Sequence, residues 1–550
     1  MADWIGGHKA WWIIGALAAI AALSGIFTVQ PLDRDESRYA QATTQMLETG
    51  DFVEIRYQDD DRNKKPVGIY WLQALSVAIV SDAESRQIWA YRLPSVLGAI
   101  LAAMGCFWAG VRLMPREAAF AGASLFAVSV LLGSEGSIAK TDAMLAGVTT
   151  LAMAALVALR TGGGRREALI FWAMLGLGIL IKGPVTPMVA GLTGLALLIW
   201  ERKWSWIKPL FFWPGPVSGA LIVLPWLIAV QIATDGEFLR EAIGVDLAPR
   251  LASGIESHGG LPGYHLLALS LLSLPVIFFL VPGLWKTVKD AQAEDDQTAS
   301  AARFLIAWIL PSWLVFELMP TKLPHYPLPV YPALALIAGS GWSIWRTSPA
   351  WTRLMSVFLG LFGALAFCVL LIAGPLEYGA SDLPGYVGAG IFVVLVFGVA
   401  VTLVRNRPAP ALMLALIAAL GGHFLLKGVS IPTARDLDLS RQAANAVDQL
   451  SEANDLDALP VISSYTEPSF VFLTATGTRL VAFEEMGEAI SAMSGPFASV
   501  EDTARSGSDL DVLEQIETGV CARAEVPGFN YSRGLETVLI VRLHNCEEAR

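Results

Sequence analysis

Apolar segments about as long as a bilayer crossing recur along most of the chain. A window of about 19 residues finds thirteen, at roughly 10–28, 93–111, 117–133, 143–159, 168–181, 185–200, 211–231, 264–284, 304–319, 327–345, 352–373, 386–404 and 409–426. Since 54% of the residues are hydrophobic and only 16% are charged, a soluble globular protein is excluded. We therefore predict an all-α polytopic membrane protein with about thirteen transmembrane helices.

The connections between these segments predict how the chain is oriented. Those after the second, fourth, sixth, eighth, tenth and twelfth segments all carry Lys or Arg, as cytoplasmic loops do. The N-terminus is then cytoplasmic, and the odd number of spans places residues 427–550 on the outer side. The stretch 4–28 lacks the small-residue cleavage pattern of a signal peptide, so we interpret it as a retained helix.

The first loop, residues 29–92, does not follow this charge rule. It holds eight Lys or Arg and eleven Asp or Glu, although it is predicted to lie on the outer side. Cations kept there despite their cost for insertion are better explained by an anionic ligand. Within the loop, residues 67–80 are apolar and aromatic but too short to cross, so we expect a juxtamembrane helix in the interface.

After residue 426 the composition becomes that of a soluble protein. Helical spacing at 435–450 and 484–493 and strand patterns at 460–464, 479–483 and 537–543 predict a small α/β domain over residues 427–550. In an oxidising outer compartment its Cys521 and Cys546 would form a disulfide, which we favour over two unpaired thiols. The net charge of −11 comes with no clustered basic face, which excludes nucleic-acid binding.

Polar side chains gather at the ends of the apolar segments on the predicted outer side. Loops that are far apart in the sequence supply the same inventory of carboxylates, cations and tyrosines, which predicts a shared cavity open to that side. The group comprises Asp35, Glu36, Arg38, Tyr39, Lys64, Lys65, Arg86, Arg92, Lys140, Asp142, Lys182, Arg250, His258, Lys322, His325 and Tyr326.

A helix that begins near Asp33 would place Asp35, Arg38 and Tyr39 on one face. This arrangement holds a carboxylate beside a guanidinium that can bind a phosphate with two hydrogen bonds. For Asp33 and Glu36 we favour the simpler interpretation, in which both cap the start of this helix.

Other members of the group have simpler interpretations too. His325 lies between prolines, and we favour a solvated turn histidine. Asp142 opens a predicted span and can serve the helix N-terminus, but beside the other charged groups we favour a functional role. Lys182, followed by Gly and Pro, marks either a helix-breaking turn or part of the site, and both interpretations stay open.

Five motifs in order carry a resemblance to a known family. They are Asp-Glu-x-Arg-Tyr at 35–39, Lys-Pro-Val-Gly-Ile-Tyr-Trp at 65–71, Lys-Thr-Asp at 140–142, Leu-Ile-Lys-Gly-Pro at 180–184 and Lys-Leu-Pro-His-Tyr-Pro-Leu-Pro at 322–329. The chain resembles the polyprenyl-phosphate-sugar-dependent glycosyltransferases of the GT-C fold. Within them it is most similar to the lipid A aminoarabinose transferase (ArnT-like) family and, more distantly, to the protein O-mannosyltransferases.

The resemblance implies roles for individual residues. Asp35 matches the essential aspartate of the family, and Arg38, Lys65 and Tyr326 match positions that hold the phosphate of the polyprenyl carrier. Asp142 matches a second functional aspartate. We therefore predict Asp35 and Asp142 as catalytic residues; the predicted substrate-binding residues are Arg38, Tyr39, Lys64, Lys65, Lys182, Arg250, His258, Lys322 and Tyr326.

One position departs from the family pattern. The residue before the Lys-Pro of the first loop is typically a Glu that contributes to a metal site, whereas here it is Lys64. A cation at this position would repel a divalent metal, although His258 matches a histidine near the metal or acceptor site. We therefore expect that no cofactor is required; a divalent metal with His258 as a ligand stays open but is disfavoured by Lys64.

The resemblance implies an inverting glycosyltransferase of the bacterial inner membrane with its active site on the periplasmic face. The donor would be undecaprenyl phosphate carrying aminoarabinose or a uronic acid such as galacturonic acid. The acceptor would be lipid A or inner-core lipopolysaccharide, and we expect a monomer embedded in membrane lipid. The alternative is a protein O-mannosyltransferase with a polyprenyl-phosphate-mannose donor. Transport is disfavoured, because the charges crowd one face and no internal repeat is found.

Overall fold

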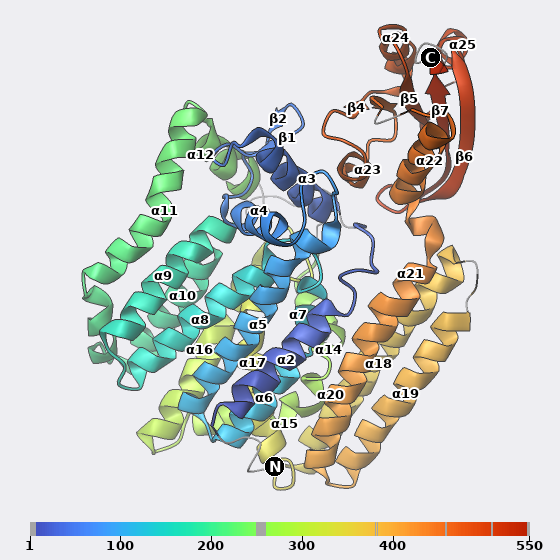
Figure 1. Ribbon diagram of the computed structural model, residues 1–550. Helices are drawn as coiled ribbons and strands as arrows, with labels where there is room; N and C mark the ends of the chain where they lie inside the picture. The colour runs from blue at the N-terminus through green and yellow to red at the C-terminus, as the bar shows by residue number, and fades with distance from the viewer. Residues whose placement is uncertain are drawn as a thin grey trace.

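The computed structural model describes residues 7–32, 34–248, 260–379, 381, 383–456, 459–507 and 510–546. Within these ranges, the apolar segments fold into helices that lie side by side in a bundle (Figure 1). Seven described helices are long and apolar enough to cross a membrane, and three shorter ones are also apolar. The chain is thus a multi-pass membrane protein, while the count of thirteen spans stays a prediction.

Each of the thirteen apolar segments is helical. The bundle consists of α2 (Lys9–Leu23), α5 (Ile88–Leu113), α6 (Arg116–Ala127), α7 (Val130–Glu135), α8 (Asp142–Arg160), α9 (Arg165–Lys182), α10 (Val185–Glu201), α11 (Pro214–Ala233), α14 (Tyr264–Leu272), α15 (Ile277–Asp290), α16 (Asp296–Leu318), α17 (Tyr331–Ser343), α18 (Ala350–Tyr378), α19 (Leu383–Val404) and α20 (Pro408–Phe424). Short segments join them: η1 (Ser205–Phe211), α12 (Glu237–Glu241), η2 (Ala242–Leu247), η3 (Leu328–Val330), η4 (Leu425–Ser430) and α21 (Ile431–Thr433).

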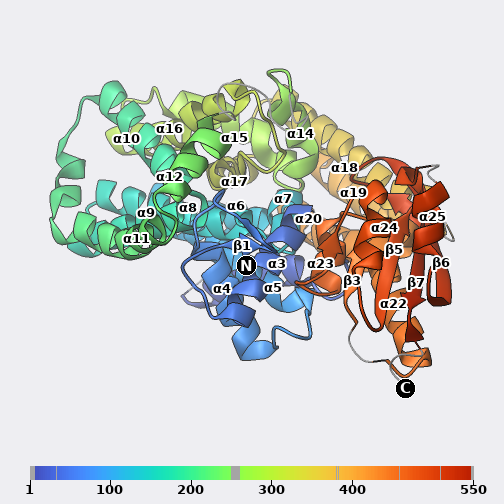
Figure 2. The same ribbon diagram turned by 90° about the horizontal axis from the view of Figure 1, so that it is seen from above.

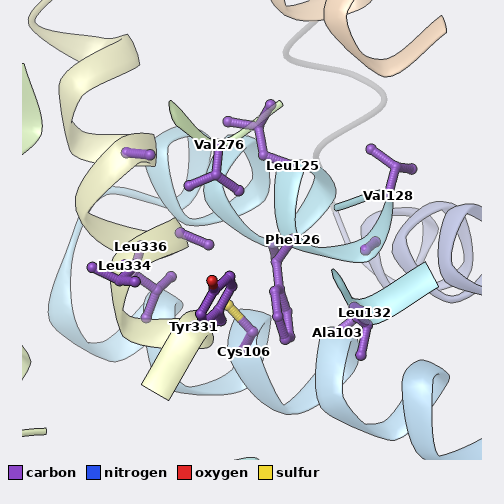
Figure 3. Packing of buried hydrophobic residues seen from close by; sticks show 14 of the residues in the cluster. Ala103, Cys106, Leu125, Phe126, Val128, Leu132, Val276, Tyr331, Leu334 and Leu336 are labelled. Carbon is purple, nitrogen blue, oxygen red and sulfur yellow. The ribbon is translucent and has the colours of Figure 1, made fainter. Parts of the chain in front are cut away.

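Two of the predicted segments are broken helices. The first is divided between α6 and α7, and the second between α14 and α15, where Pro275 has no N–H to continue a helix. The two breaks share a backbone hydrogen bond, because the Val130 N–H donates to the Leu274 carbonyl at 2.9 Å. Backbone groups freed inside an apolar bundle need such a partner. Figure 3 shows Val128 and Val276, at the two breaks, in one cluster of buried side chains.

Close helix contacts bring α5 and α8 together along most of their length. A Cβ atom added at Gly98 of α5 would lie 2.5 Å from the carbonyl carbon of Ala143, at the start of α8. Only a glycine permits this approach. The start of α8 is therefore placed against the backbone of α5.

The first loop covers the end of the bundle opposite the N-terminus (Figure 1). It forms helix α3 (Arg34–Thr49), a hairpin of β1 (Arg56–Tyr57) and β2 (Asp60–Asp61), and helix α4 (Gly68–Val80), where the sequence predicts an interfacial helix. The buried Gln73 of α4 accepts a hydrogen bond from Thr43 of α3 at 2.8 Å and donates to the Ala139 carbonyl at 3.1 Å. These bonds fix α3 and α4 against the bundle.

Glu36 has a role that the capping interpretation does not include. Its side chain is 2% exposed and accepts two hydrogen bonds from Arg92 of α5, at 2.7 and 2.9 Å. It also accepts the Ala139 N–H at 2.7 Å. Arg92 in turn donates to the carbonyls of Ile26 and Val29, so this ion pair holds the start of α3 on the bundle. Asp33 lies outside the described residues.

A soluble-type domain follows the last helix of the bundle, and we call it the outer domain (residues 435–546 as described). Its sheet has the strand order β4-β3-β5-β7-β6, with β3 parallel to its two neighbours and the other pairs antiparallel. The strands are β3 (Val461–Ser463), β4 (Arg479–Leu480), β5 (Phe497–Asp502), β6 (Val520–Asn530) and β7 (Leu535–His544). The helical segments are η5 (Arg435–Leu437), α22 (Leu439–Ala453), α23 (Pro468–Leu473), α24 (Phe483–Ser491), η6 (Thr503–Arg505) and α25 (Leu510–Ile516).

This sheet agrees with the strand patterns at 460–464, 479–483 and 537–543, but β5 and β6 were not predicted. Polar residues such as Ser499 and Glu501 are buried in β5, where a sequence pattern does not separate them from a loop. Cys521 and Cys546 form a disulfide that joins the start of β6 to the residues after β7.

The outer domain contacts the first loop directly. Thr476 accepts a hydrogen bond from Gln41 of α3 at 2.7 Å, and the Phe472 carbonyl accepts one from Arg86 at 3.1 Å. Phe472 also packs edge to face against Tyr91 of α5. Seen from above, the outer domain lies beside α3 and α4 rather than over the far helices α9 and α11 (Figure 2).

Candidate functional site

The first turn of α3 presents Asp35 and Arg38 together. An Arg38 guanidinium nitrogen lies 3.5 Å from an Asp35 carboxylate oxygen, and the two side chains are 30% and 52% exposed. Burial raises the pKa of Asp35, but the nearby cations Lys140, Arg62 and Arg38 outweigh it and hold the pKa below its usual value. Asp35 is therefore an ionised carboxylate that remains open to solvent.

A second carboxylate stands at the start of α8. The Asp142 side chain accepts a hydrogen bond from the Lys182 ammonium at 2.5 Å, and the pair is nearly buried. Lys182, at the end of α9, also lies over the Tyr326 ring at 5.6 Å from its centre. The Leu-Ile-Lys-Gly-Pro stretch is thus more than a turn, since its lysine joins two other predicted residues.

The solvated-turn interpretation of His325 is wrong. The side chain is 8% exposed and lies between two carboxylates, 3.6 Å from Glu135 and 3.7 Å from Asp142. Burial, with smaller contributions from Lys140 and Lys182, lowers the pKa of His325 to about 3 against the opposing effect of Asp142. The ring is neutral at pH 7 and is held inside the cluster.

Sequence reasoning missed Arg62 and Glu135. Arg62 follows three consecutive aspartates, and such a polar run is typical of a solvated turn. In the structure, however, Arg62 donates to the Tyr70 hydroxyl at 3.1 Å. Its guanidinium also lies over the Tyr39 ring at 5.3 Å. Glu135 ends α7 two residues after a predicted apolar segment, and it is buried; a carboxylate this close to a span is a signal of function that could have been used.

Lys140 connects the two carboxylates electrostatically. It is 7% exposed and lowers the pKa of Asp35 more than any other cation does. The sequence pointed to Lys140 as an outer-side cation without assigning it to the substrate-binding residues. Glu36, which pairs with Arg92, also accepts a hydrogen bond from the N–H of Ala139, the residue before Lys140. The same buried carboxylate therefore fixes the start of α3 and the segment that carries Lys140 and Asp142.

The structure brings six of the predicted residues together, and we call them, with Arg62, Glu135, Lys140 and His325, the charged cluster. The six are Asp35, Arg38, Tyr39, Asp142, Lys182 and Tyr326. In contrast, Lys322 donates to the Met319 carbonyl at 2.7 Å and is nearly buried. Lys64 is exposed and Lys65 is half-buried, while Arg250 and His258 lie outside the described residues.

The described residues contain no group of three or more His, Cys, Asp or Glu side chains arranged to hold a metal ion. Because His258 lies outside them, the expectation that no metal is required stays a prediction. The chemistry that the charged cluster offers is electrostatic: cations that can stabilise a phosphate, beside an ionised carboxylate.

Comparisons with known proteins bear on this arrangement. A family model described as dolichyl-phosphate-mannose-protein mannosyltransferase matches residues 64–228. The undecaprenyl phosphate-alpha-4-amino-4-deoxy-L-arabinose arabinosyl transferase of Erwinia tasmaniensis is 28% identical over 375 residues, which are 66% of this chain and 64% of that protein. Its namesake from Pseudomonas aeruginosa is 29% identical over 328 residues, 57% of either chain.

The fold is shared with a solved structure over nearly its whole length. The crystal structure of ArnT from Cupriavidus metallidurans bound to undecaprenyl phosphate superposes with a TM-score of 0.75 at 18% identity, covering 96% of this chain and 97% of that one. The chain therefore has the fold of ArnT, and in sequence it is similar to the aminoarabinose transferases. The resemblance inferred from the five motifs is thereby confirmed.

More distant structures share the GT-C arrangement. The oligosaccharyltransferase of Archaeoglobus fulgidus in the apo form superposes with a TM-score of 0.53 at 12% identity, covering 94% of this chain and 74% of that one. In sequence, this chain matches 64% of the length of the Erwinia protein.

Proposed function

We propose that this protein transfers 4-amino-4-deoxy-arabinose from undecaprenyl phosphate to lipid A. The reaction would take place on the periplasmic face of a bacterial inner membrane, with the N-terminus in the cytoplasm. The names of the curated relatives support this donor sugar, and the similar crystal structure has undecaprenyl phosphate bound. The orientation rests on the distribution of Lys and Arg between the apolar segments.

The charged cluster is the observation that carries the proposal. Arg38, Arg62, Lys140 and Lys182 lie close enough to Asp35 to lower its pKa, and Lys182 also pairs with Asp142. An excess of cations at one end of a membrane bundle suits a lipid phosphate. In a place with little water they would stabilise the charge that builds up on this phosphate as the glycosidic bond breaks.

The bond changes are those of a single displacement. The acceptor oxygen would attack the anomeric carbon while the bond from that carbon to the phosphate oxygen breaks, and the lipid phosphate would leave with the electron pair. Attack opposite the leaving group inverts the configuration. For a hydroxyl acceptor the ionised Asp35 would take the proton, whereas a phosphate acceptor would already be ionised, and Asp35 would then stabilise the positively charged sugar.

A second candidate donor sugar is a hexuronate. It is favoured by Lys64, an exposed cation in the first loop that would repel the amino group of aminoarabinose and attract a carboxylate. An assay of donor binding separates the two. Lys64→Glu should weaken binding of a uronate donor, and unchanged affinity for that donor would remove this candidate.

The experiment is mass spectrometry of lipid A and inner core from cells that lack the protein or carry the wild type, Asp35→Ala or Asp296→Ala. Asp296 is the matched control, because it is an exposed carboxylate paired with Lys203 at the start of α16. We expect one added pentosamine with the wild type and the control but not with Asp35→Ala. An added hexuronate would select the second sugar. Unmodified lipid A and core in every strain would refute the proposal and direct the search to mannosylated proteins.

A further inference from the structure

Three arginines of the described chain meet where the outer domain touches the start of α3. Arg34 opens α3, Arg505 ends η6, and Arg533 lies in the turn between β6 and β7. They surround Thr466 and Glu467, the two residues before α23. We call these three guanidinium groups the arginine rim.

The contacts inside the rim leave an excess of positive charge. Glu467 is nearly buried and lies 3.3 Å from Arg34 and 3.8 Å from Arg533. Arg533 also donates to the Thr466 hydroxyl at 3.1 Å, and Arg505 donates to the same oxygen at 3.2 Å. Arg505 has no carboxylate partner within the described ranges, so three guanidinium groups share one carboxylate.

The neighbouring carboxylates do not supply the missing charge. Glu501 is buried and lies 2.8 Å from Arg542, and it accepts a hydrogen bond from Ser506. Asp502 is also buried and accepts from Thr537 at 2.5 Å. Among the described residues, Glu467 is the one carboxylate within ion-pair distance of any of the three arginines, so the rim attracts an anion such as a phosphate monoester. A guanidinium offers five N–H donors in a planar fork that fits phosphate oxygens.

The rim is continuous with the charged cluster. Arg34 and Arg38 are four residues apart on α3, which places them on the same face one turn from each other. Tyr57 of β1 lies close to both groups, because charges of both act on its hydroxyl. Burial raises the pKa of Tyr57 to about 12; Arg38 and Arg62 of the charged cluster lower this pKa, and Glu467 of the rim raises it. Asp35 lies in the sequence between the two arginines. A molecule held at the rim would thus reach the open carboxylate of Asp35.

We propose that the arginine rim binds a phosphate group of the acceptor glycolipid and places the acceptor above Asp35. This inference rests on the proposed function for the identity of the acceptor, but its test needs no sugar transfer. The outer domain would then contribute two of the three arginines of the acceptor site. The donor phosphate would be held separately, by the charged cluster.

The test is equilibrium binding to the full-length protein in phosphatidylcholine nanodiscs. The probes are bisphosphorylated lipid A, dephosphorylated lipid A and undecaprenyl phosphate. The variants are Arg505→Gln with Arg533→Gln in one chain, and Arg523→Gln as the control. Arg523 is also an exposed arginine of the outer domain, but it lies near the opposite end of β6, beside Glu525.

A charged hydrogen bond to phosphate is worth about tenfold in affinity or more. We expect the double variant to bind bisphosphorylated lipid A at least about tenfold more weakly, and undecaprenyl phosphate as tightly as the wild type does. Dephosphorylated lipid A should bind the wild type about tenfold more weakly than bisphosphorylated lipid A does. This loss should equal the loss that the double variant shows for bisphosphorylated lipid A. The control should behave as the wild type.

Unchanged binding of bisphosphorylated lipid A to a folded double variant would overturn the inference. An equal loss for undecaprenyl phosphate would also overturn it, because the rim would then serve the donor. Thermal unfolding of the double variant alongside the control excludes a general loss of structure. A protein that binds lipid A through the rim but transfers no aminoarabinose would support the inference while refuting the proposed donor.

Discussion

Asp35 and Glu36 are adjacent in the sequence, yet their side chains have different surroundings. Asp35 is half-exposed among cations, and Glu36 is buried with two hydrogen bonds from Arg92. The difference follows from the helix, because consecutive residues point about 100° apart around its axis. One carboxylate is available to a substrate, and its neighbour supports the helix that carries it.

This contrast predicts opposite effects of two similar substitutions. Asp35→Asn should lower the rate of sugar transfer by about 100-fold or more and leave the free energy of unfolding nearly unchanged. Glu36→Gln leaves the buried Arg92 without its counter-ion and should lower the free energy of unfolding by about 3–5 kcal/mol. Thermal unfolding and a transfer assay on both variants check the pair. A Glu36→Gln protein as stable as the wild type would contradict the supporting role.

The neutral His325 predicts how stability depends on pH. Its pKa is lowered from the usual 6.5 to about 3 in the folded protein, so the unfolded chain binds more protons between these values. This contribution to stability is present above pH 6.5 and is lost progressively as the pH falls toward 3. The melting temperature should therefore fall on acidification below pH 6.5, and less steeply in His325→Gln. An equally steep fall in the variant would contradict a neutral ring among Glu135, Asp142, Lys140 and Lys182.

The same groups predict the pH dependence of activity. Asp35 has a lowered pKa and stays ionised throughout the neutral range, and His325 stays neutral there. Neither group changes charge between pH 6 and 8, so kcat/KM should show no step near 6.5. The measurement is a pH profile with a donor whose own groups do not titrate in that window. A step near 6.5 that disappears in His325→Gln would contradict this expectation.

At the scale of elements, Asp142 is positioned by the contact between α5 and α8. Gly98→Ala would place a Cβ 2.5 Å from the Ala143 carbonyl carbon, where the backbone has no room to yield. We expect a loss of about 1–3 kcal/mol in the free energy of unfolding and slower transfer, because the start of α8 must shift. Gly390→Ala in α19 is the control, since an added Cβ there meets nothing within 4 Å. Equal effects of the two substitutions would show that the close approach does not position Asp142.

The positions of the helices could be predicted from the sequence, because uninterrupted apolar runs have few alternatives in a membrane. The breaks between α6 and α7 and between α14 and α15 could not, since they depend on a hydrogen bond between Val130 and Leu274. The motifs identified Asp35, Arg38, Asp142 and Lys182. Arg62 was missed because its local sequence is that of a solvated turn, and its partners Tyr39 and Tyr70 meet it only in the folded chain.

At the scale of the whole molecule, the charged cluster is assembled from four separate stretches. The first loop supplies Asp35 and Arg62, and the stretch from the end of α7 to the start of α8 supplies Glu135, Lys140 and Asp142. Lys182 comes from the end of α9, and His325 from the segment before α17. The sequence pattern of one stretch does not predict which side chains of another stretch will lie next to it in the folded protein. The resemblance to a family supplied that connection, and the outer domain, whose sequence has no catalytic motif, was left without a role.

The contact between Thr476 and Gln41 joins two stretches that are far apart in the sequence and are therefore synthesised at different times. A ribosome makes α3 long before the outer domain, and each part folds as it emerges. Helix α3 would therefore wait for more than 400 residues of synthesis, from Gln41 to Thr476, before its outer face is covered. If the arginine rim binds the acceptor, a chain cut short before the outer domain would still insert its helices but would lack two of the three arginines of that site.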